Sequence, residues 1–148
     1  EPLHLVQKNS LKKVESVSSQ IKSGIILGAD TIVVLNDEIL GKPKNETEAF
    51  LMLKKLNGKW HTVYSGVAML NKTNLKKVIG YESTQVKFHS LSDEQILKYV
   101  ATKDPLDKAG AYGIQSQGSF LVEKLEGNFD NVMGLPLNKV KELITKIL

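Results

Sequence analysis

Hydrophobic and polar residues follow two different periods along the chain, and these periods predict its strands and helices. β-branched and aliphatic residues dominate Ile25–Leu35 and return in Glu38–Leu40, with Asn36 and Asp37 between the two runs. Two polar residues between apolar runs are typical of a two-residue β-turn. We therefore predict a β-hairpin in which the last residue of the first run faces the first residue of the second.

Apolar residues at helical spacing predict four helices. They are expected over Leu3–Lys22, from Asn45 to the residues before Gly58, from Ser92 to the residues before Asp104, and from Pro136 towards the C-terminus. Asn45 and Ser92 precede Glu48 and Gln95 by three positions, which is the pattern of a capping box. Two of the helices therefore carry a local start signal.

Strand-like residues also occupy Trp60–Leu70 and Leu75–Phe88, and a short strand is expected at Ser119–Leu125. Strands thus follow one another in pairs, with helices before and after them. This order predicts an α/β fold with a mixed, largely antiparallel sheet and flanking helices. It fits a doubly wound nucleotide-binding fold poorly, because such folds alternate strands with helices.

The composition favours one domain and is compatible with an anionic partner. With 148 residues, 41% of them hydrophobic, the chain can bury one core, so we expect a single domain over residues 1–148. Short apolar runs and first residues unlike a signal peptide lead us to expect a cytoplasmic protein without membrane contact. A net charge of +4 fits an anionic partner or a solvated lysine surface equally well. The absence of cysteine excludes disulfides and thiolate metal sites.

Asp30 interrupts the apolar run of the predicted hairpin. A carboxylate in an apolar strand loses hydration, so a cation, a hydrogen-bond donor or a metal must compensate it. Lys42 is the first candidate, and a contact would require the second strand to end or bulge near Gly41–Pro43. This segment is not a phosphate-binding P-loop, because that motif needs Ser or Thr after the lysine, where Pro43 stands.

A second unusual segment, Asp107–Gln115, contains two glycines and two alanines together with charged, aromatic and amide side chains. Small residues would let the backbone approach a ligand closely, but a tight loop between a helix and a strand explains the same composition. His61 is likewise either a half-buried structural histidine or a site residue. The three histidines show no metal-ligand spacing.

Several short motifs follow one another in a fixed order. They are Gly28-Ala29-Asp30-Thr31, Leu40-Gly41-Lys42-Pro43, Asn57-Gly58, His61-x-Val63-x-Ser65-Gly66, Thr84-x-Val86-x-Phe88, Asp107–Gln115 and Asn131-Val132-x-Gly134-Leu135-Pro136-Leu137. In this order they resemble the Maf family of nucleoside triphosphate pyrophosphatases, also called septum formation inhibitors. The resemblance covers essentially the whole chain.

The resemblance implies hydrolysis of a nucleoside triphosphate to the monophosphate and pyrophosphate, with a divalent metal, Mg²⁺ or Mn²⁺, as cofactor. Asp30 matches the family's proposed proton acceptor, and Thr31 and Gln115 match residues linked with the choice of base. The lysines expected around the triphosphate are Lys13, Lys42 and Lys108, and the carboxylates expected around the metal are Asp30, Asp107 and Glu82.

Two segments match the family branch that acts on dTTP and UTP. They are His61-Thr62-Val63 and Ala111–Gln115. The amide of Gln115 has a donor and an acceptor that can pair with the O4 and N3–H groups of uracil or thymine, and the ring of Tyr112 can stack on the base. A buried amide would select strongly against other bases.

The chain also departs from the family pattern. Family members carry a first strand and a Ser-x-Ser-Pro-Arg-Arg loop ahead of the matching segments, and Ser65 and Asn128 stand where threonine and aspartate are usual. Compared with the family, the chain is therefore expected to be an N-terminally truncated domain, which is either a fragment or truncated gene model or a protein of impaired activity. The alternative is a non-catalytic domain that binds nucleotides or, less expectedly, nucleic acid, and the sequence leaves a homodimer open. A purely structural domain is disfavoured by the clustering of Asp30, Lys42 and Asp107–Gln115.

Overall fold

The predicted hairpin is present in the computed structural model, which describes residues 1–148 apart from the side chain of Ser116. β1 (Ile25–Leu35) and β2 (Glu38–Leu40) pair antiparallel, with Leu35 opposite Glu38 as predicted. Asn36 and Asp37 have φ angles of 48° and 67°, the left-handed conformation that a two-residue hairpin turn requires. β2 ends at Leu40, so Lys42 lies beyond the end of the strand. A strand end or a bulge here was the condition for a contact between Lys42 and Asp30.

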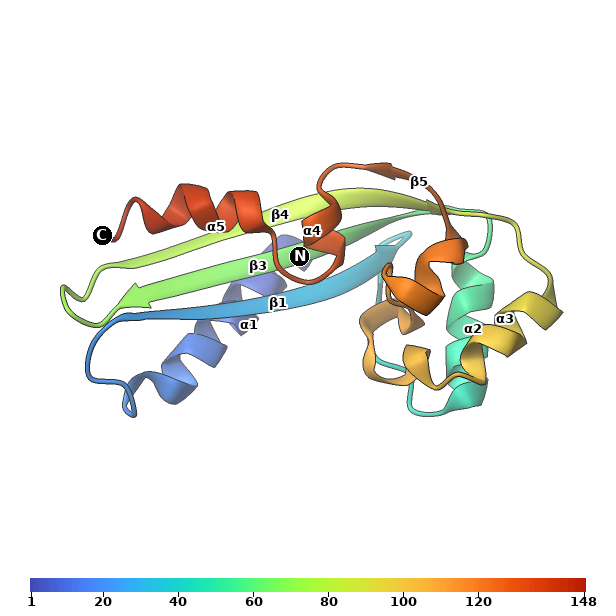
Figure 1. The fold of residues 1–148 in the computed structure, drawn as a ribbon, viewed down its shortest axis with the longest axis horizontal. Coiled ribbons are helices and arrows are strands. Elements are labelled where there is room, and N and C mark those ends of the chain that lie inside the picture. The colour runs from blue at the N-terminus through green and yellow to red at the C-terminus, as the bar shows by residue number, and fades with distance from the viewer. The chain divides into compact units, whose positions relative to one another are not determined.

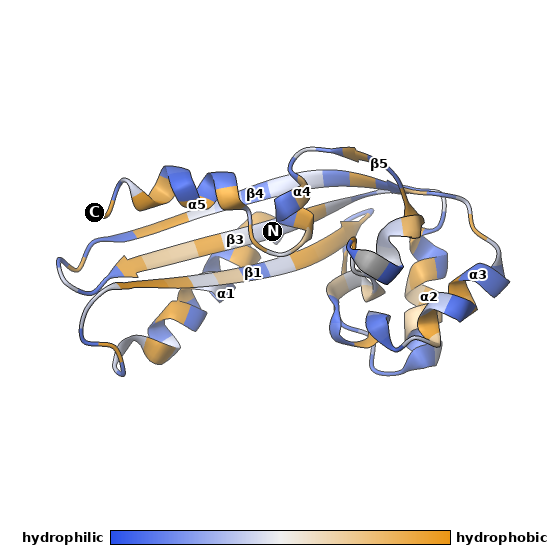
Figure 2. Ribbon diagram, in the orientation of Figure 1, coloured by the Kyte–Doolittle hydropathy of each residue, from blue (hydrophilic) through white to orange (hydrophobic). Residues whose placement is uncertain are grey.

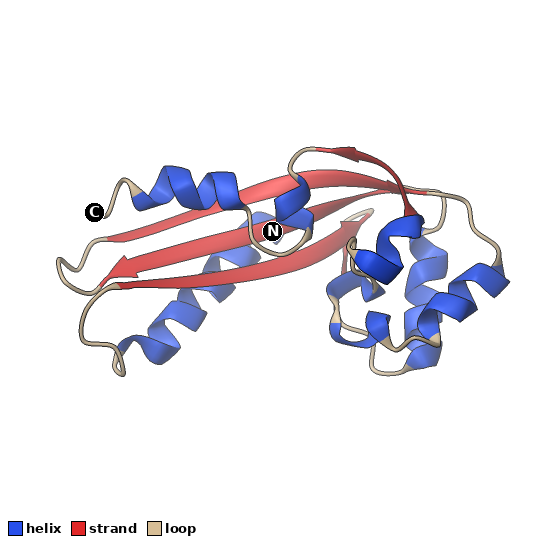
Figure 3. Ribbon diagram, in the orientation of Figure 1, coloured by secondary structure: helices blue, strands red, loops and turns tan.

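Five strands form one sheet in the order β2-β1-β3-β4-β5 (Figure 3). The remaining strands are β3 (Trp60–Asn71), β4 (Lys77–Phe88) and β5 (Val122–Glu126). β4 and β5 pair antiparallel, with Val86 opposite Leu125. The predicted α/β fold with a largely antiparallel sheet and flanking helices is confirmed. β5 begins three residues later than expected because Ser119 to Leu121 belong to a 3-10 helix.

The chain divides into two compact units, each described below by itself. The first unit comprises Glu1–Thr31, Tyr64–Ser83 and Phe129–Leu148, and the second comprises Ile32–Val63 and Thr84–Asn128. This division does not test the prediction of one domain over residues 1–148, which stays a prediction.

In the first unit, helices cover both faces of the sheet (Figure 1). The helices are α1 (Pro2–Ser18), α4 (Phe129–Val132) and α5 (Leu137–Ile144). Successive residues of a strand point to opposite faces. Ala68 of β3 packs with Val14 of α1, whereas Val67 and Met69 pack with Leu143 of α5. Because neighbouring residues of β3 contact different helices, α1 packs on one face of the sheet and α5 packs on the other.

α1 is shorter than the predicted helix over Leu3–Lys22. It ends at Ser18, and Val17 in its last turn and Ile21 beyond its end are each 39% exposed. A further turn would bury little apolar surface, and tertiary burial supplies most of the stability of a short helix.

The second unit contains α2 (Glu46–Leu56), α3 (Asp93–Val100) and three 3-10 helices. The 3-10 helices are η1 (Asp104–Asp107), η2 (Ala109–Ala111) and η3 (Ser116–Leu121). Asn45 accepts a hydrogen bond from the Glu48 amide at 2.8 Å, and Ser92 and Gln95 form the full capping box. Both predicted helix starts are confirmed.

The apolar colour of β1 is interrupted near its middle (Figure 2). In the sequence, the polar residues Asp30 and Thr31 of this strand follow the buried Ile26 and directly precede the buried Ile32. Across the part of the chain that the structure describes, no helix combines the length and the apolar character that a bilayer crossing needs.

Candidate active site

α1 approaches the sheet very closely at two glycines. A Cβ atom at Gly66 of β3 would lie 2.2 Å from the carbonyl oxygen of Val6, and one at Gly28 of β1 would lie 2.6 Å from that of Ser10. Atoms in a close-packed interior do not approach so closely, so a side chain at either position would push the helix away. The two glycines therefore allow α1 to pack directly on β1 and β3, and this brings polar side chains of α1 to Asp30.

Asp30 is held by two side chains of α1. Asn9 Nδ2 donates to Asp30 Oδ2 at 3.0 Å, and Lys13 Nζ donates to Asp30 Oδ1 at 3.3 Å. Lys13 Nζ also donates to the carbonyl oxygen of Ala29 at 2.7 Å. The donor and the cation that the sequence requires for this carboxylate thus come from α1. The pairing of Asp30 with Lys42 stays a prediction.

The Asp30 carboxylate remains able to react. Its side chain is 19% exposed, and each of its oxygens keeps a lone pair beyond the bond from Asn9 or Lys13. Both neighbours donate to it, so they fix its orientation. A fixed and partly exposed carboxylate can bind a cation or accept a proton from water.

Thr31, the next residue of β1, joins a chain of hydroxyl groups. Thr31 Oγ1 lies 2.7 Å from Ser65 Oγ, and the Ser65 hydroxyl donates to the carbonyl oxygen of Asn131 at 3.1 Å. A hydroxyl has one proton, so with Ser65 donating to Asn131, the Thr31 proton is directed to Ser65 Oγ or to the carbonyl oxygen of Gly134, which lies 3.4 Å from Thr31 Oγ1. Thr31 then offers a ligand only acceptor lone pairs, and its assignment to substrate binding stays a prediction.

The sequence also predicts Asp107 and Glu82 as metal ligands together with Asp30. In residues 1–115 and 117–148, no group of three or more His, Asp or Glu side chains is arranged to hold a metal ion. A preformed cage of protein carboxylates is therefore absent from the described residues. The assignment of these three ligands stays a prediction.

In the second unit, Lys108 is held by two acidic residues. Its Nζ donates to Asp104 Oδ1 at 2.8 Å, to the Asp104 carbonyl oxygen at 3.0 Å and to Asp107 Oδ1 at 3.0 Å. Burial alone would lower the pKa of Lys108, but its hydrogen bonds to the two carboxylates raise that pKa above the ordinary value. Lys108 therefore remains charged, as a phosphate-binding lysine must.

Tyr112 lies in the core instead of lining a surface. It is 5% exposed, and its ring packs edge to face with Phe88 and His61 at centroid distances of 4.7 and 5.5 Å. Its hydroxyl lies 2.7 Å from His61 Nε2. The buried ring has little surface to stack on a base, so the structure gives no support to the expected stacking. It indicates instead that Tyr112 anchors the segment that leads to Gln115.

His61 is 3% exposed, so it is fully buried and not half-buried as expected. Burial lowers its pKa from 6.5 to about 4. The imidazole is therefore neutral at physiological pH and acts as an uncharged hydrogen-bonding partner of Tyr112. This supports the structural interpretation of His61.

His61 should make the protein sensitive to acid. Below pH 6.5 the unfolded chain binds a proton at this position that the folded chain does not bind until about pH 4. The free energy of unfolding should thus be unaffected by His61 at higher pH and fall by up to about 3 kcal/mol across this window. Urea unfolding of the wild type and of His61→Phe between these pH values measures the effect. The variant keeps an aromatic ring, and an equally steep acid loss in both proteins would contradict the prediction.

Two other residues that the sequence analysis assigned to the site are exposed in the structure. Lys42 lies in the loop after β2, and Gln115 lies just before η3. Both are accessible to a ligand. Gln115 is exposed in the free chain, and because water can pair with an exposed amide, base selection through Gln115 should be weaker than a buried amide would give.

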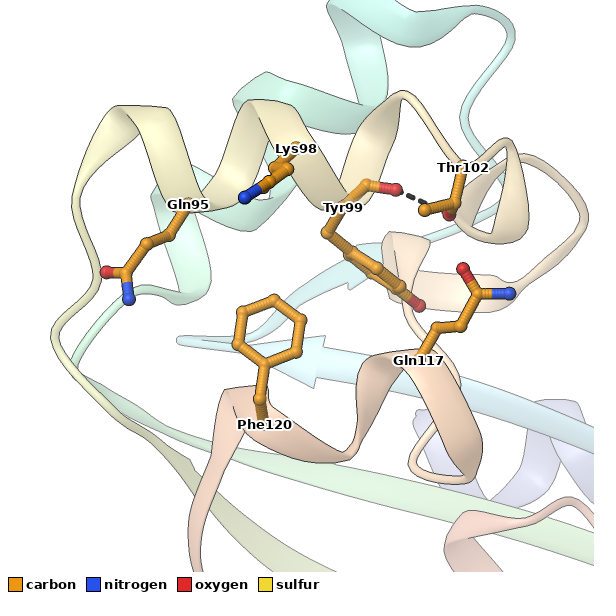
Figure 4. A pocket seen from close by; sticks show the side chains of 6 residues that line it. All are labelled: Gln95, Lys98, Tyr99, Thr102, Gln117 and Phe120. Atoms are coloured by element: carbon orange, nitrogen blue, oxygen red, sulfur yellow. Dashed lines mark hydrogen bonds between the residues drawn. The ribbon is translucent and has the colours of Figure 1, made fainter.

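A pocket of about 450 Å³ lies between α3 and η3 (Figure 4). The residues that line it are Gln95, Lys98, Tyr99, Thr102, Gln117 and Phe120. The rings of Tyr99 and Phe120 meet edge to face at a centroid distance of 5.7 Å. None of the site residues expected from the sequence is among these six.

Sequence reasoning missed three residues that hold the predicted ones in place, namely Asn9, Tyr99 and Asp104. Asn9 precedes Lys13 by four positions, so both lie on the same side of α1, and this spacing was an available signal. Asp104 likewise precedes Lys108 by four positions. Nothing in the sequence pattern singled out the hydroxyl of Tyr99.

Comparison with known proteins gives a consistent result. A family profile described as "Maf-like protein" matches residues 1–147. A protein of Thermosipho melanesiensis named dTTP/UTP pyrophosphatase is 51% identical over 144 residues, which cover 97% of this chain and 76% of that protein. A protein of Dictyoglomus turgidum with the same name is 47% identical over 145 residues, which cover 98% of this chain and 75% of that protein.

Proposed function

The chain belongs to the Maf-like protein family, and on this premise we propose that it hydrolyses nucleoside triphosphates, preferring dTTP and UTP, to the monophosphate and pyrophosphate. The names of its relatives support this activity. The observation that carries the proposal is the Asp30 carboxylate, which Asn9 and Lys13 orient on β1 within the matching motif. A non-catalytic nucleotide-binding domain is not favoured.

In the proposed reaction, Asp30 accepts a proton from a water molecule. The water oxygen forms a bond to the α-phosphorus, and the bond from that phosphorus to the α–β bridging oxygen breaks. Pyrophosphate leaves with the electron pair of the broken bond. Asn9 and Lys13 contribute by keeping the carboxylate in one orientation, so that little reorganisation is needed when the proton moves.

Lysines neutralise the charge that develops on the phosphates. Lys13, with a side chain 56% exposed, has room to turn part of its donor set towards a ligand. Lys42 is exposed, and the charged ammonium group of Lys108 is held in place by its hydrogen bond to Asp104. We assign all three to the triphosphate.

A divalent metal, Mg²⁺ or Mn²⁺, fits the chemistry of Asp30, whose carboxylate is a hard oxygen ligand with free lone pairs. Mg²⁺ is commonly held by one or two carboxylates together with substrate phosphates, so a single oriented carboxylate is compatible with such a site. When bound, the metal would neutralise phosphate charge. Asp107 and Glu82 are the further ligands that we propose.

The nucleotide substrate also leads us to propose a cytoplasmic location, where nucleotides are abundant. We propose in addition that nucleic acid is not a partner and that the protein forms a homodimer. Light scattering of the purified chain at several concentrations tests the dimer.

The choice of base gives the test of the proposed function. Pyrophosphate release should be faster from UTP and dTTP than from CTP, GTP and 7-methyl-GTP, because the Gln115 amide can pair with both O4 and N3–H of the favoured bases. Since Gln115 is exposed, we expect about tenfold selectivity, and Gln115→Ala should lose most of it. Steady-state rates at equal nucleotide concentration with Mg²⁺ measure this. Absence of pyrophosphate release from every nucleotide would refute the activity, and preference for 7-methyl-GTP would refute the base assignment.

A further inference from the structure

The hydroxyl of Tyr99 joins two separate segments of the second unit. It donates to Asp104 Oδ2 at 2.6 Å and accepts a hydrogen bond from the Gly113 amide at 3.1 Å. Tyr99 is 3% exposed, so water competes little for these bonds. Burial and the bond to Asp104 raise the pKa of Tyr99 far above the ordinary value. The hydroxyl therefore stays protonated and donates to Asp104 at any physiological pH.

Asp104 connects the Tyr99 hydroxyl to the Lys108 ammonium group through hydrogen bonds. One of its carboxylate oxygens accepts from Tyr99 and the other accepts from Lys108 Nζ at 2.8 Å. Its own backbone is fixed as well, because its amide donates to Thr102 Oγ1 at 3.2 Å. Burial alone would raise the pKa of Asp104, but the bonds from Lys108 and Tyr99 lower it below the ordinary value. Asp104 is thus a fixed anion that sets the position of the ammonium group.

The stem of Lys108 is confined on its other side. A Cβ atom at Gly113 would lie 2.7 Å from Lys108 Cε and 2.9 Å from its Cδ, so the lysine packs directly over the glycine. The Gly113 amide is the group that donates to Tyr99. One hydroxyl therefore positions both the anion that binds the ammonium group and the backbone that supports the lysine stem.

The two carboxylates that contact Lys108 are not equivalent. The Asp104 side chain is 24% exposed and held by Tyr99, whereas the Asp107 side chain is 81% exposed. A solvent-exposed ion pair contributes little to stability, so a phosphate can replace Asp107 at low cost. Replacing Asp104 would leave a partly buried anion without its cation. The ammonium group can thus exchange one partner for a ligand while Asp104 keeps it in place.

We propose that Tyr99 is a positioning residue that holds Lys108, through Asp104 and Gly113, in the orientation that receives the triphosphate. This inference rests on the proposed function in so far as Lys108 is assigned to the phosphates. Tyr99 itself touches no substrate in this arrangement. Its ring packs against Phe120 and lines the pocket (Figure 4), while its hydroxyl is bonded to Asp104 and Gly113.

Tyr99→Phe tests the proposal, because it removes one oxygen and keeps the ring. We expect KM for UTP to rise about fivefold to tenfold with kcat changed less than about twofold, since the chemical step at Asp30 is untouched. Lys108→Ala should raise KM at least as much. In the Lys108→Ala background, Tyr99→Phe should have no further effect on KM, because the group that it positions is gone.

Tyr81→Phe is the matched control, since Tyr81 lies on β4 and is 39% exposed. It should leave KM and kcat unchanged. An unchanged KM in Tyr99→Phe would overturn the proposal. So would an equal rise in KM with and without Lys108, because a residue that only stabilises the fold acts independently of that lysine.

One measurement on the full chain does not depend on turnover. The affinity for inorganic tripolyphosphate should fall about fivefold to tenfold in Tyr99→Phe. If the wild type releases no pyrophosphate, the proposed function fails and this affinity decides the positioning role alone. Unchanged affinity would refute the positioning role whether or not UTP is hydrolysed.

Discussion

Asp30→Asn is expected to lower the turnover of UTP by about two to four orders of magnitude, because the amide cannot accept the proton that a carboxylate accepts. The amide oxygen can still receive the hydrogen bond that Asn9 donates to Asp30, so the site should keep its shape. The affinity for UTP should therefore change little. Single-turnover rates and equilibrium binding of UTP, measured on the same preparation, separate the two effects.

Glu38→Gln is a matched acid-to-amide control. Glu38 pairs with Lys55 on the surface, its side chain is 52% exposed, and the variant should hydrolyse UTP at the wild-type rate. Wild-type turnover in Asp30→Asn would remove Asp30 from the role of base. A parallel loss of binding and turnover would instead assign Asp30 to substrate binding.

Gly66→Ala is expected to cost about 3 kcal/mol of the free energy of unfolding, which for a chain of this size is a drop of about 10 °C in Tm. The added Cβ atom would lie 2.2 Å from the Val6 carbonyl oxygen and 2.4 Å from its carbon, and backbone atoms cannot turn aside as a side chain can. α1 would have to move away from β3. Thermal or urea unfolding followed by circular dichroism measures the loss.

Gly41→Ala is the control for this effect, because nothing lies within 4 Å of a Cβ atom at Gly41. Its free energy of unfolding should stay within about 0.5 kcal/mol of the wild type. Equal stability of the two variants would show that α1 does not press on β3 at Gly66. Because Asn9 and Lys13 belong to α1, any folded Gly66→Ala protein should also hydrolyse UTP more slowly.

The hairpin shows how far sequence reasoning reached in the fold. Its register and its turn at Asn36 and Asp37 were predicted correctly. The starts of α2 and α3 were also predicted correctly, because the hydrogen bond of a helix cap joins residues only three positions apart in the sequence. The end of α1 was not predicted, because it depends on how much apolar surface a further helical turn would bury against the rest of the protein.

The sequence by itself determined the local elements, the presence of a carboxylate that needs partners and, through its motifs, the family. Those properties depend on residues that are close in the chain or on the order of the motifs. Only the tertiary structure decided the partners of Asp30, because Asn9 and Lys13 lie 21 and 17 positions away and reach it only where α1 packs on glycines. It also decided the burial of Tyr112 with His61, which lie 51 positions apart, and the hydrogen bond from Gly113 to Tyr99, which lie 14 positions apart. Packing between distant segments sets such contacts, and periodicity along the chain carries no record of them.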